Sequence, residues 1–107
     1  MNDRDLIASG AVVLVNVFTP LPGMTDAFIA AQTAEYRRLR GLVRGALGNR
    51  LLRSRDSSKA VNIAYFESTE LYDAWIGSEL FADHLARIRH LIDKVEPSLY
   101  TLVYESE

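Results

Sequence analysis

VVLVNVFT, residues 12–19, is a run of β-branched and apolar residues interrupted by a single amide, Asn16. Such a run is typical of a central strand that is covered on both faces. A second run, AVNIAYFE at residues 60–67, has the same character and carries Asn62 near its centre. Side chains alternate along a strand, so each asparagine shares a face with bulky apolar neighbours. The two runs predict neighbouring inner strands of one sheet, each with an amide inside it.

The rest of the chain predicts three helices and two more strands. Apolar residues recur at helical spacing in the helical segments, and Ser68 and Ser78 are suited to cap the second and third helices. Thr25 offers a cap for the first helix, and Pro97 stops the last one. The expected elements are a helix at about 25–40, a strand at 46–54, a short helix from 68 that Gly77 closes, a helix at 80–95 and a final strand at 99–104.

This order is β-α-β-β-α-β with the second helix broken, which is the ferredoxin-like split βαβ arrangement of the α+β class, with an antiparallel sheet. The helices would cover one face of that sheet. Both alternating sets of side chains in strand 12–19 are apolar, so the other face needs a cover as well. Two subunits packed sheet to sheet would provide it. The sequence therefore predicts a homodimer.

Length and composition set further bounds. The chain has 107 residues, which fits one domain, and we expect residues 1–10 to be a flexible N-terminal segment and residues 11–107 a single domain. No cysteine is present, which excludes disulfides, thiolate metal sites and cysteine nucleophiles. No apolar run reaches the length that a membrane span needs. We expect a cytoplasmic protein without membrane association.

The charge is unevenly distributed. The formal net charge is -2, yet residues 37–59 are strongly basic, with only Asp56 as an opposing charge. A nucleic-acid-binding domain would show a basic surface overall, with exposed aromatic residues between the charges, and neither is evident. We interpret the basic stretch as a solvated helix end and hairpin, and expect no nucleic-acid partner.

Three polar residues in apolar settings could form a site. Asn16 and Asn62 would meet between sheet and helices if both face the helices, although an asparagine can also bridge a bulge or a buried water in an ordinary core. His84 lies on the apolar stripe of helix 80–95, where a neutral core histidine bonded to a carbonyl is the usual explanation. His90 is expected to point outward and carries no hypothesis.

Aromatic residues cluster around the same segments. Trp75 on the short helix is either a core or lid aromatic or a functional group. Phe66, Tyr72 and Phe81 would be simple packing in most domains, but in a pocket they would form walls for a flat aromatic ligand. The sequence contains no dinucleotide or phosphate-binding glycine motif and no metal-ligand spacing, so no metal is expected. Any redox chemistry would then depend on a ligand that the protein binds, or would proceed without a cofactor.

Several segments together, in order, resemble a known family. They are Val15–Phe18 followed by a proline and glycine turn, Leu51–Ser54, Val61–Ser68, Trp75 with Phe81 and His84 after it, and Glu96–Tyr100. Over about residues 12–105 the chain resembles the antibiotic biosynthesis monooxygenases, which are small dimeric α+β barrels. The resemblance implies that fold and a dimer for this chain.

Within that family the sequence looks closest to the cofactor-independent anthrone oxygenases of aromatic polyketide pathways. These enzymes convert a tricyclic or tetracyclic phenol to a quinone with dioxygen alone. The resemblance implies no cofactor and catalytic roles for Asn16, Asn62 and Trp75. We assign His84 as a base or proton shuttle, because the ordinary pKa of histidine allows either role near neutrality. The implied substrate-binding residues are Phe66, Tyr72 and Phe81. Some relatives carry tryptophan where this chain has Phe66.

Two alternatives stay open at this stage. The haem-degrading monooxygenases share the fold and a triad that Asn16, Trp75 and His84 also match, which would make haem the cofactor. Asn62 and the segment Glu96–Tyr100 favour the polyketide branch instead. A noncatalytic dimeric binding protein is the third reading, since fold does not dictate function. A small or water-filled cavity, with Asn16 and Asn62 bonded to backbone groups on opposite sides of the sheet, would favour a noncatalytic protein.

Overall fold

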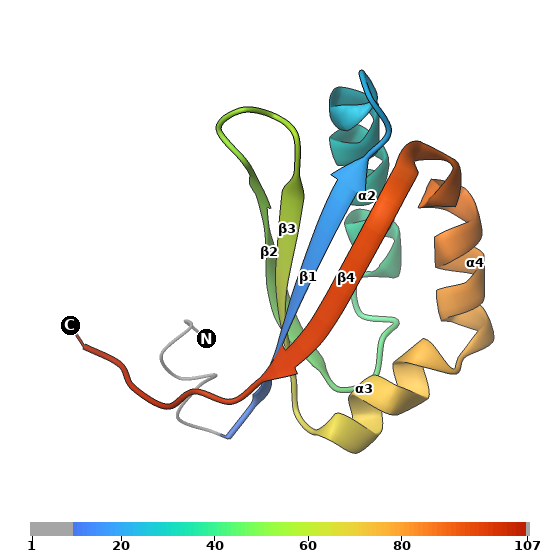
Figure 1. Cartoon of the computed structure of the whole chain (residues 1–107). Coiled ribbons are helices and arrows are strands. Elements are labelled where there is room, and N and C mark those ends of the chain that lie inside the picture. The colour runs from blue at the N-terminus through green and yellow to red at the C-terminus, as the bar shows by residue number, and fades with distance from the viewer. Residues whose placement is uncertain (1–9, 107) are drawn as a thin grey trace.

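One antiparallel sheet carries all its helices on a single face (Figure 1). The computed structural model describes residues 10–106. Within them the sheet has four strands in the order β2-β3-β1-β4. The elements are β1 (Val12–Pro20), α2 (Thr25–Leu39), β2 (Ala46–Arg53), β3 (Ala60–Phe66), α3 (Thr69–Ile76), α4 (Glu79–Ile88), the short 3-10 helix η1 (Arg89–Leu91) and β4 (Ile92–Tyr100). The predicted α+β class and split βαβ order are confirmed. Residues 1–9 of the predicted N-terminal segment lie outside the described residues.

The two asparagine-bearing runs are neighbouring inner strands. β1 lies between β3 and β4, and its register with β3 places Asn16 directly opposite Asn62. On the same face, Phe18 pairs with Ala60 on one side of the asparagines and Leu14 pairs with Ala64 on the other. The amides therefore form a polar row between two apolar rows.

Those apolar rows belong to two core clusters between sheet and helices. In the first, Phe18 packs on Phe28 of α2 with ring centroids 4.9 Å apart, and Ile88 of α4 is fully buried beside them. In the second, Leu14, Ala64 and Phe66 are buried against residues of α3 and the loop before β2. Fully burying a large apolar side chain stabilises a fold by about 1.5–3 kcal/mol. The two clusters hold the helices on either side of the asparagine row.

Serine caps begin both helices after β3. The Ser68 hydroxyl accepts a hydrogen bond from the Leu71 backbone N–H, and Ser78 accepts one from Phe81, each at 3.1 Å. Both predicted caps are confirmed. The prediction for Thr25 is wrong, because Met24 occupies the N-cap position of α2. The Thr25 hydroxyl instead donates to the Ser57 carbonyl at 2.7 Å and ties the start of α2 to the turn between β2 and β3.

The predicted end of the chain is also wrong. Instead of a helix to Val95 and a strand at 99–104, α4 ends at Ile88 and β4 spans Ile92–Tyr100. Pro97 therefore lies within a strand, opposite Asn16. Proline lacks a ladder donor, but β4 is at the edge of the sheet, where one side of the strand is unpaired. The alternation of Val95, Pro97 and Leu99 is the strand signal, and the helical spacing upstream obscured it.

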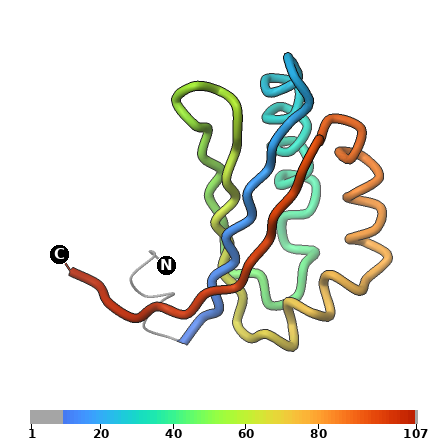
Figure 2. Tube along the Cα trace, in the orientation of Figure 1, coloured from blue at the N-terminus to red at the C-terminus, as the bar shows by residue number. Residues whose placement is uncertain are grey.

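The opposite face of the sheet has no helix over it in residues 10–106 (Figure 1). Its centre is formed by Val13, Val15 and Val17 of β1, which are only half-buried. Figure 2 shows the chain after β4 leaving the sheet on this side, away from the helices. Val103 and Tyr104 in that segment are 95% and 78% exposed. An apolar surface of this kind is typical of an interaction face.

A glycine at the entry to β2 provides a test of the packing between sheet and α3. Gly45 has a positive φ of 84°, and a Cβ atom there would lie 2.7 Å from the Leu71 Cβ. Gly41 has a similar φ of 79° but has open space around it. We expect Gly41→Ala to lower the free energy of unfolding by about 1–2 kcal/mol, the backbone cost alone. Gly45→Ala should lower it by roughly 1–3 kcal/mol more, because Leu71 must move.

Chemical denaturation of the two variants and the unchanged protein measures this difference. Equal losses for the two variants would contradict the contact between Gly45 and Leu71.

Candidate functional site

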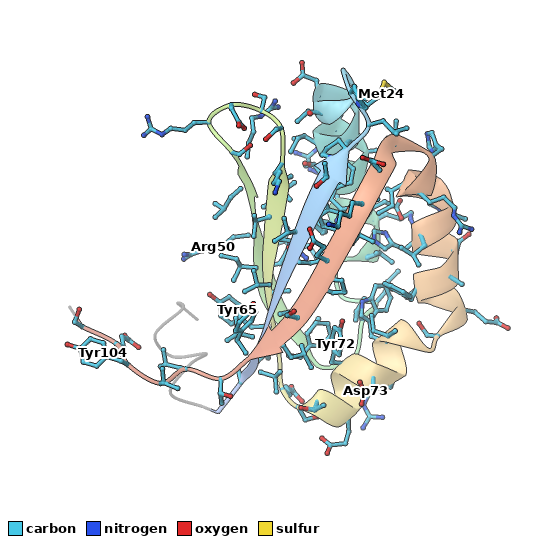
Figure 3. All side chains as sticks on the ribbon, in the orientation of Figure 1. Met24, Arg50, Tyr65, Tyr72, Asp73 and Tyr104 are labelled. Carbon is cyan, nitrogen blue, oxygen red and sulfur yellow. The ribbon has the colours of Figure 1, made fainter. Side chains whose placement is uncertain are left out.

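A cavity of about 700 Å³ lies between the helix-facing side of the sheet and helices α2, α3 and α4. This volume is within the range of sites that bind drug-sized molecules. Figure 3 shows the side chains, with Tyr72 on the side of α3 that faces the sheet. All seven residues singled out from the sequence line this cavity: Asn16, Asn62, Phe66, Tyr72, Trp75, Phe81 and His84. The fold thus brings them together, and their chemical roles stay a prediction.

The two asparagine amides differ in their hydrogen-bond partners. Asn49 of β2 donates from its Nδ2 to the Oδ1 of Asn62 at 3.2 Å, which fixes the orientation of the Asn62 amide. The Asn62 Nδ2 group is then the one left to donate to a ligand. The Oδ1 atom of Asn16 is buried and has no hydrogen-bond partner. A buried acceptor without a partner costs about 1–3 kcal/mol.

Asn49 is part of a longer chain of polar groups. Gln32 of α2 donates from its Nε2 to the Tyr36 hydroxyl at 2.8 Å, and Asn49 also hydrogen-bonds that hydroxyl. Burial raises the pKa of Tyr36 well above its usual value, although these hydrogen bonds act in the opposite direction. Tyr36 is therefore a neutral phenol at physiological pH. The chain of hydrogen bonds connects α2 through β2 to Asn62 and holds that amide in place.

On the helix side of the cavity, His84 forms a buried pair with Glu35 of α2. The His84 Nδ1 lies 3.1 Å from the Glu35 Oε1, and the two side chains are 9% and 7% exposed. Arg38 binds the same carboxylate through two hydrogen bonds, Nε to Oε2 at 2.9 Å and Nη2 to Oε1 at 2.7 Å. This two-point contact is the strong form of the arginine–carboxylate pair.

The electrostatics of this pair follow from its partners. The hydrogen bond from Arg38 lowers the pKa of Glu35 to about 2, against the opposing effect of burial. Burial lowers the pKa of His84 below its usual value, and the neighbouring Glu35 partly offsets this. At neutral pH the pair is therefore a carboxylate beside a neutral imidazole. A carboxylate only accepts hydrogen bonds, so Nδ1 carries the proton and Nε2 carries the lone pair.

Aromatic rings form the apolar part of the wall. Trp75 packs on Phe81 with ring centroids 5.1 Å apart, and both rings lie 6.1 Å from the His84 ring. On the sheet side, Phe66 and Tyr72 meet edge to face at 5.3 Å. Such rings offer flat apolar surfaces, and aromatic pairs gain from offset or edge contacts. A planar aromatic ligand suits this wall.

The sequence analysis missed the residues that hydrogen-bond to Asn62 and His84 or extend that network: Gln32, Glu35, Tyr36 and Asn49. The buried positions of α2 are Phe28, Gln32, Glu35 and Leu39, which recur at helical spacing as one stripe. The apolar residues Ala31 and Leu42 suggested a different stripe, yet Leu42 is 59% exposed. A polar pair in the middle of the stripe from Phe28 to Leu39 was the available signal. For Asn49 the signal was weaker: it lies two residues before Leu51 in a predicted strand and therefore shares a face with it.

Two absences hold for the described part of the chain. Across residues 10–106 no group of three histidine, aspartate or glutamate side chains is arranged to hold a metal ion. None of the helices in that range is long and apolar enough to cross a membrane.

Comparisons with known proteins agree with this geometry. The family model described as antibiotic biosynthesis monooxygenase matches residues 11–87. A comparison with curated proteins finds no match. Among solved structures, Rv0793 from Mycobacterium tuberculosis is 21% identical with a TM-score of 0.73, and the alignment covers 91% of this chain and 99% of that chain.

Two further structures show the same fold. PA3566 from Pseudomonas aeruginosa is 19% identical with a TM-score of 0.74, and the alignment covers 89% of this chain and 96% of that chain. A Bordetella bronchiseptica protein that carries the same family name is 15% identical with a TM-score of 0.80, covering 89% and 99%. At these identities the similarity establishes the fold and nothing finer.

The Glu35 pair predicts a pH dependence of stability. Because the folded protein holds the pKa of Glu35 at about 2, below the ordinary 4.5, the pair contributes fully above pH 4.5 and is lost as the pH falls through about 2. We expect the free energy of unfolding to fall less steeply between pH 5 and pH 2.5 in Glu35→Gln, by up to about 3 kcal/mol over that window. Urea denaturation at a series of pH values measures both slopes. Identical slopes would show that Glu35 is not held ionised by folding.

Proposed function

The chain belongs to the antibiotic biosynthesis monooxygenase family, and we propose that it oxidises a polycyclic phenol of the anthrone or dihydroquinone type to a quinone with dioxygen, without a cofactor. One observation carries the proposal. An oriented amide donor on Asn62, the side chain of Asn16 and the ring of His84, which pairs with the buried Glu35, meet at a single aromatic-walled cavity. These groups provide what the oxidation of an acidic aromatic methylene requires.

The chemistry starts with the methylene group of the substrate. Loss of a proton leaves the C–H electron pair on carbon, delocalised onto the keto oxygen as an oxyanion. This electron-rich anion gives one electron to dioxygen, and the resulting radical and superoxide combine to a peroxide. Loss of water from the protonated peroxide forms the quinone carbonyl, so that one dioxygen and one methylene yield one carbonyl and one water. The protein must hold the substrate, stabilise the oxyanion and exclude water.

The site residues divide this work. The Asn62 amide donates to the oxyanion, and a single oriented donor of this kind can supply on the order of 3 kcal/mol in the transition state. Asn16, the register partner of Asn62, contributes to hydrogen bonding of the oxyanion and the peroxide. Trp75 and Phe81 provide a flat surface that orients the rings, and Tyr72 closes the wall toward the sheet. His84 takes or relays protons at the methylene carbon.

The noncatalytic alternative has less support. It called for a small or water-filled cavity and for Asn16 and Asn62 bonded to backbone groups on opposite sides of the sheet. The two asparagines are instead register partners on one face, and the cavity measures about 700 Å³. The haem-degrading alternative uses Asn16, Trp75 and His84 from the same cavity, and the activity experiment below separates it from the oxygenase.

We propose in addition that the chain is a homodimer joined through the helix-free face of the sheet. Leu52 and Tyr100 flank the valines of β1 on that face and are 50% and 54% exposed. Tyr104, labelled in Figure 3, lies on the same side, away from the helices. A second copy would cover this apolar area, and in a twofold dimer each copy covers the other with the same patch.

The activity test uses purified protein free of metal and haem, incubated with dithranol in air and under nitrogen. We expect oxygen uptake and quinone absorbance that depend on both protein and air. Asn62→Ala should slow turnover roughly tenfold or more, because the oxyanion donor is lost. Asp73→Ala, an exposed change on the outer side of α3, is the control and should keep the rate. Circular dichroism checks that both variants fold.

One result would contradict the role of Asn62, and another would contradict the oxygenase itself. The first is an unchanged rate in Asn62→Ala, which removes this residue from the mechanism. The second is no oxidation together with tight haem binding, seen as a shift of the Soret band that is lost in His84→Ala, which would favour haem degradation.

The dimer is tested with a charge at the centre of the helix-free face. Val15→Arg places a guanidinium where the partner sheet would pack, and burying an unpaired charge costs several kcal/mol. We expect a dimer for the unchanged protein and a monomer for the variant in sedimentation velocity. Asp73→Arg adds the same charge on the helix side and should remain a dimer. A monomeric unchanged protein at micromolar concentrations would refute the proposal.

A further inference from the structure

We propose that Glu35 is the positioning residue of the site, which orients His84 so that its Nε2 abstracts the methylene proton of the substrate, with Arg38 fixing the carboxylate. The inference rests on the proposed function and deepens it, because it separates proton abstraction from the reaction with dioxygen. Its consequence is a second measurable activity. Without oxygen, the protein should catalyse hydrogen exchange at the methylene carbon of the same substrate.

His84 and Glu35 lie at different distances from the cavity. His84 lines the cavity, whereas Glu35 does not and contacts His84 from the α2 side. Glu35 is thus buried behind His84, and we infer that it acts through the imidazole. The imidazole Nδ1 is engaged by the carboxylate, so Nε2 is the ring atom free to meet a ligand. A core histidine of purely structural use would have no cavity beside its ring.

The carboxylate of Glu35 is held in one orientation by its neighbours. Arg38 holds both oxygens of Glu35, at 2.9 and 2.7 Å, and Oε1 also lies 3.1 Å from His84. Residues three apart on a helix lie on the same face, so α2 presents Glu35 and Arg38 together. The side chain of Arg38 is 30% exposed and that of Glu35 only 7%, so Glu35 lies deeper in the protein than Arg38. Arg38 thus fixes the carboxylate of Glu35, and this carboxylate in turn fixes the imidazole of His84.

When His84 takes a proton, the positive charge of its imidazolium is balanced by the carboxylate of Glu35. Burial disfavours an imidazolium at this position, but a carboxylate 3.1 Å away stabilises it. The charged groups near His84 are Glu35 and Arg38 on α2 and Asp83 on its own helix. Asp83 is 54% exposed, so water screens its effect. Glu35 is the only one of the three that is both buried and negatively charged.

The proton transfer itself is balanced without an oxidant. The Nε2 lone pair forms a bond to the methylene proton, and the C–H electron pair stays on the substrate as the enolate, with its oxygen at the Asn62 amide. No electron leaves the substrate in this step. Under nitrogen the enolate can only regain a proton from His84, and in D2O the imidazolium exchanges its proton for a deuteron first. Deuterium therefore accumulates at the methylene carbon.

The test measures deuterium incorporation into dithranol by NMR under nitrogen, above the rate without protein. We expect the unchanged protein to accelerate exchange, Glu35→Gln to lower the rate constant roughly tenfold or more, and His84→Ala to abolish it. Asp83→Asn is the matched control, a neighbouring carboxylate that is exposed, and should stay within about twofold. Imidazole added to the solution should restore part of the exchange in His84→Ala and none in Glu35→Gln.

Binding is followed separately through Trp75, the only tryptophan of the chain, which lies in the cavity wall. Quenching of its fluorescence gives the Kd for dithranol, which should be the same in Glu35→Gln as in the unchanged protein. A positioning role predicts this split between rate and affinity, and a merely structural role does not. Arg38→Gln, which keeps Glu35, provides a second variant should Glu35→Gln fail to fold, and should also slow exchange.

The outcomes separate this inference from the proposed function. Absence of quenching and of aerobic oxidation would overturn the proposed function and this inference with it. Binding and aerobic oxidation, with the same exchange rate in the unchanged protein, Glu35→Gln and Arg38→Gln, would overturn the positioning role of Glu35 and leave the oxygenase standing.

Discussion

The pairing of β1 with β3 is the constraint on which the site depends. Its register places Asn16 opposite Asn62 and puts one apolar pair on each side of them. Shifting the register by one residue would turn every side chain of β1 to the other face, which would expose Phe18 and bury the far-face valines against the helices. The burial of Phe18 and Leu14 therefore fixes the position of the amides. Apolar packing determines where the polar chemistry lies.

The second set of polar groups comes from two helices, Glu35 and Arg38 from α2 and His84 from α4. Burying these groups lowers the stability of the fold relative to an apolar core. Burying a carboxylate and an imidazole is expensive even when they are paired, and a well-packed apolar pair is often as stable. Here Arg38 and His84 satisfy both oxygens of Glu35 inside a chain with room for only a modest core. The cavity beside this pair removes further packing. Such an expense is typical of sites where function outweighs stability.

Most strands and helices of the fold could be predicted from the sequence. The physical reason why an element could or could not be predicted differs from one to the next. The runs at 12–19 and 60–67 are unambiguous because their β-branched residues and length fit only strands. Ser68 and Ser78 could be recognised as caps because their effect is local. The end of α4 could not be placed, since Leu91, Ile92 and Val95 fit a helix as well as a strand, and pairing with β1 decides between them. Glu35 was missed because a charged residue on an apolar stripe is normally assigned to the surface.

The orientation of Asn62 lies beyond any pattern in the sequence. An amide offers a donor and an acceptor, and which of them meets the ligand depends on the partner of the other. Asn49 takes the Asn62 oxygen, and Tyr36 and Gln32 hold Asn49 in turn. Each of these residues is unremarkable in its own segment of the chain. Because they come from α2, β2 and β3, only the assembled fold gives the amide its direction and leaves its Nδ2 group as the donor that faces away from Asn49.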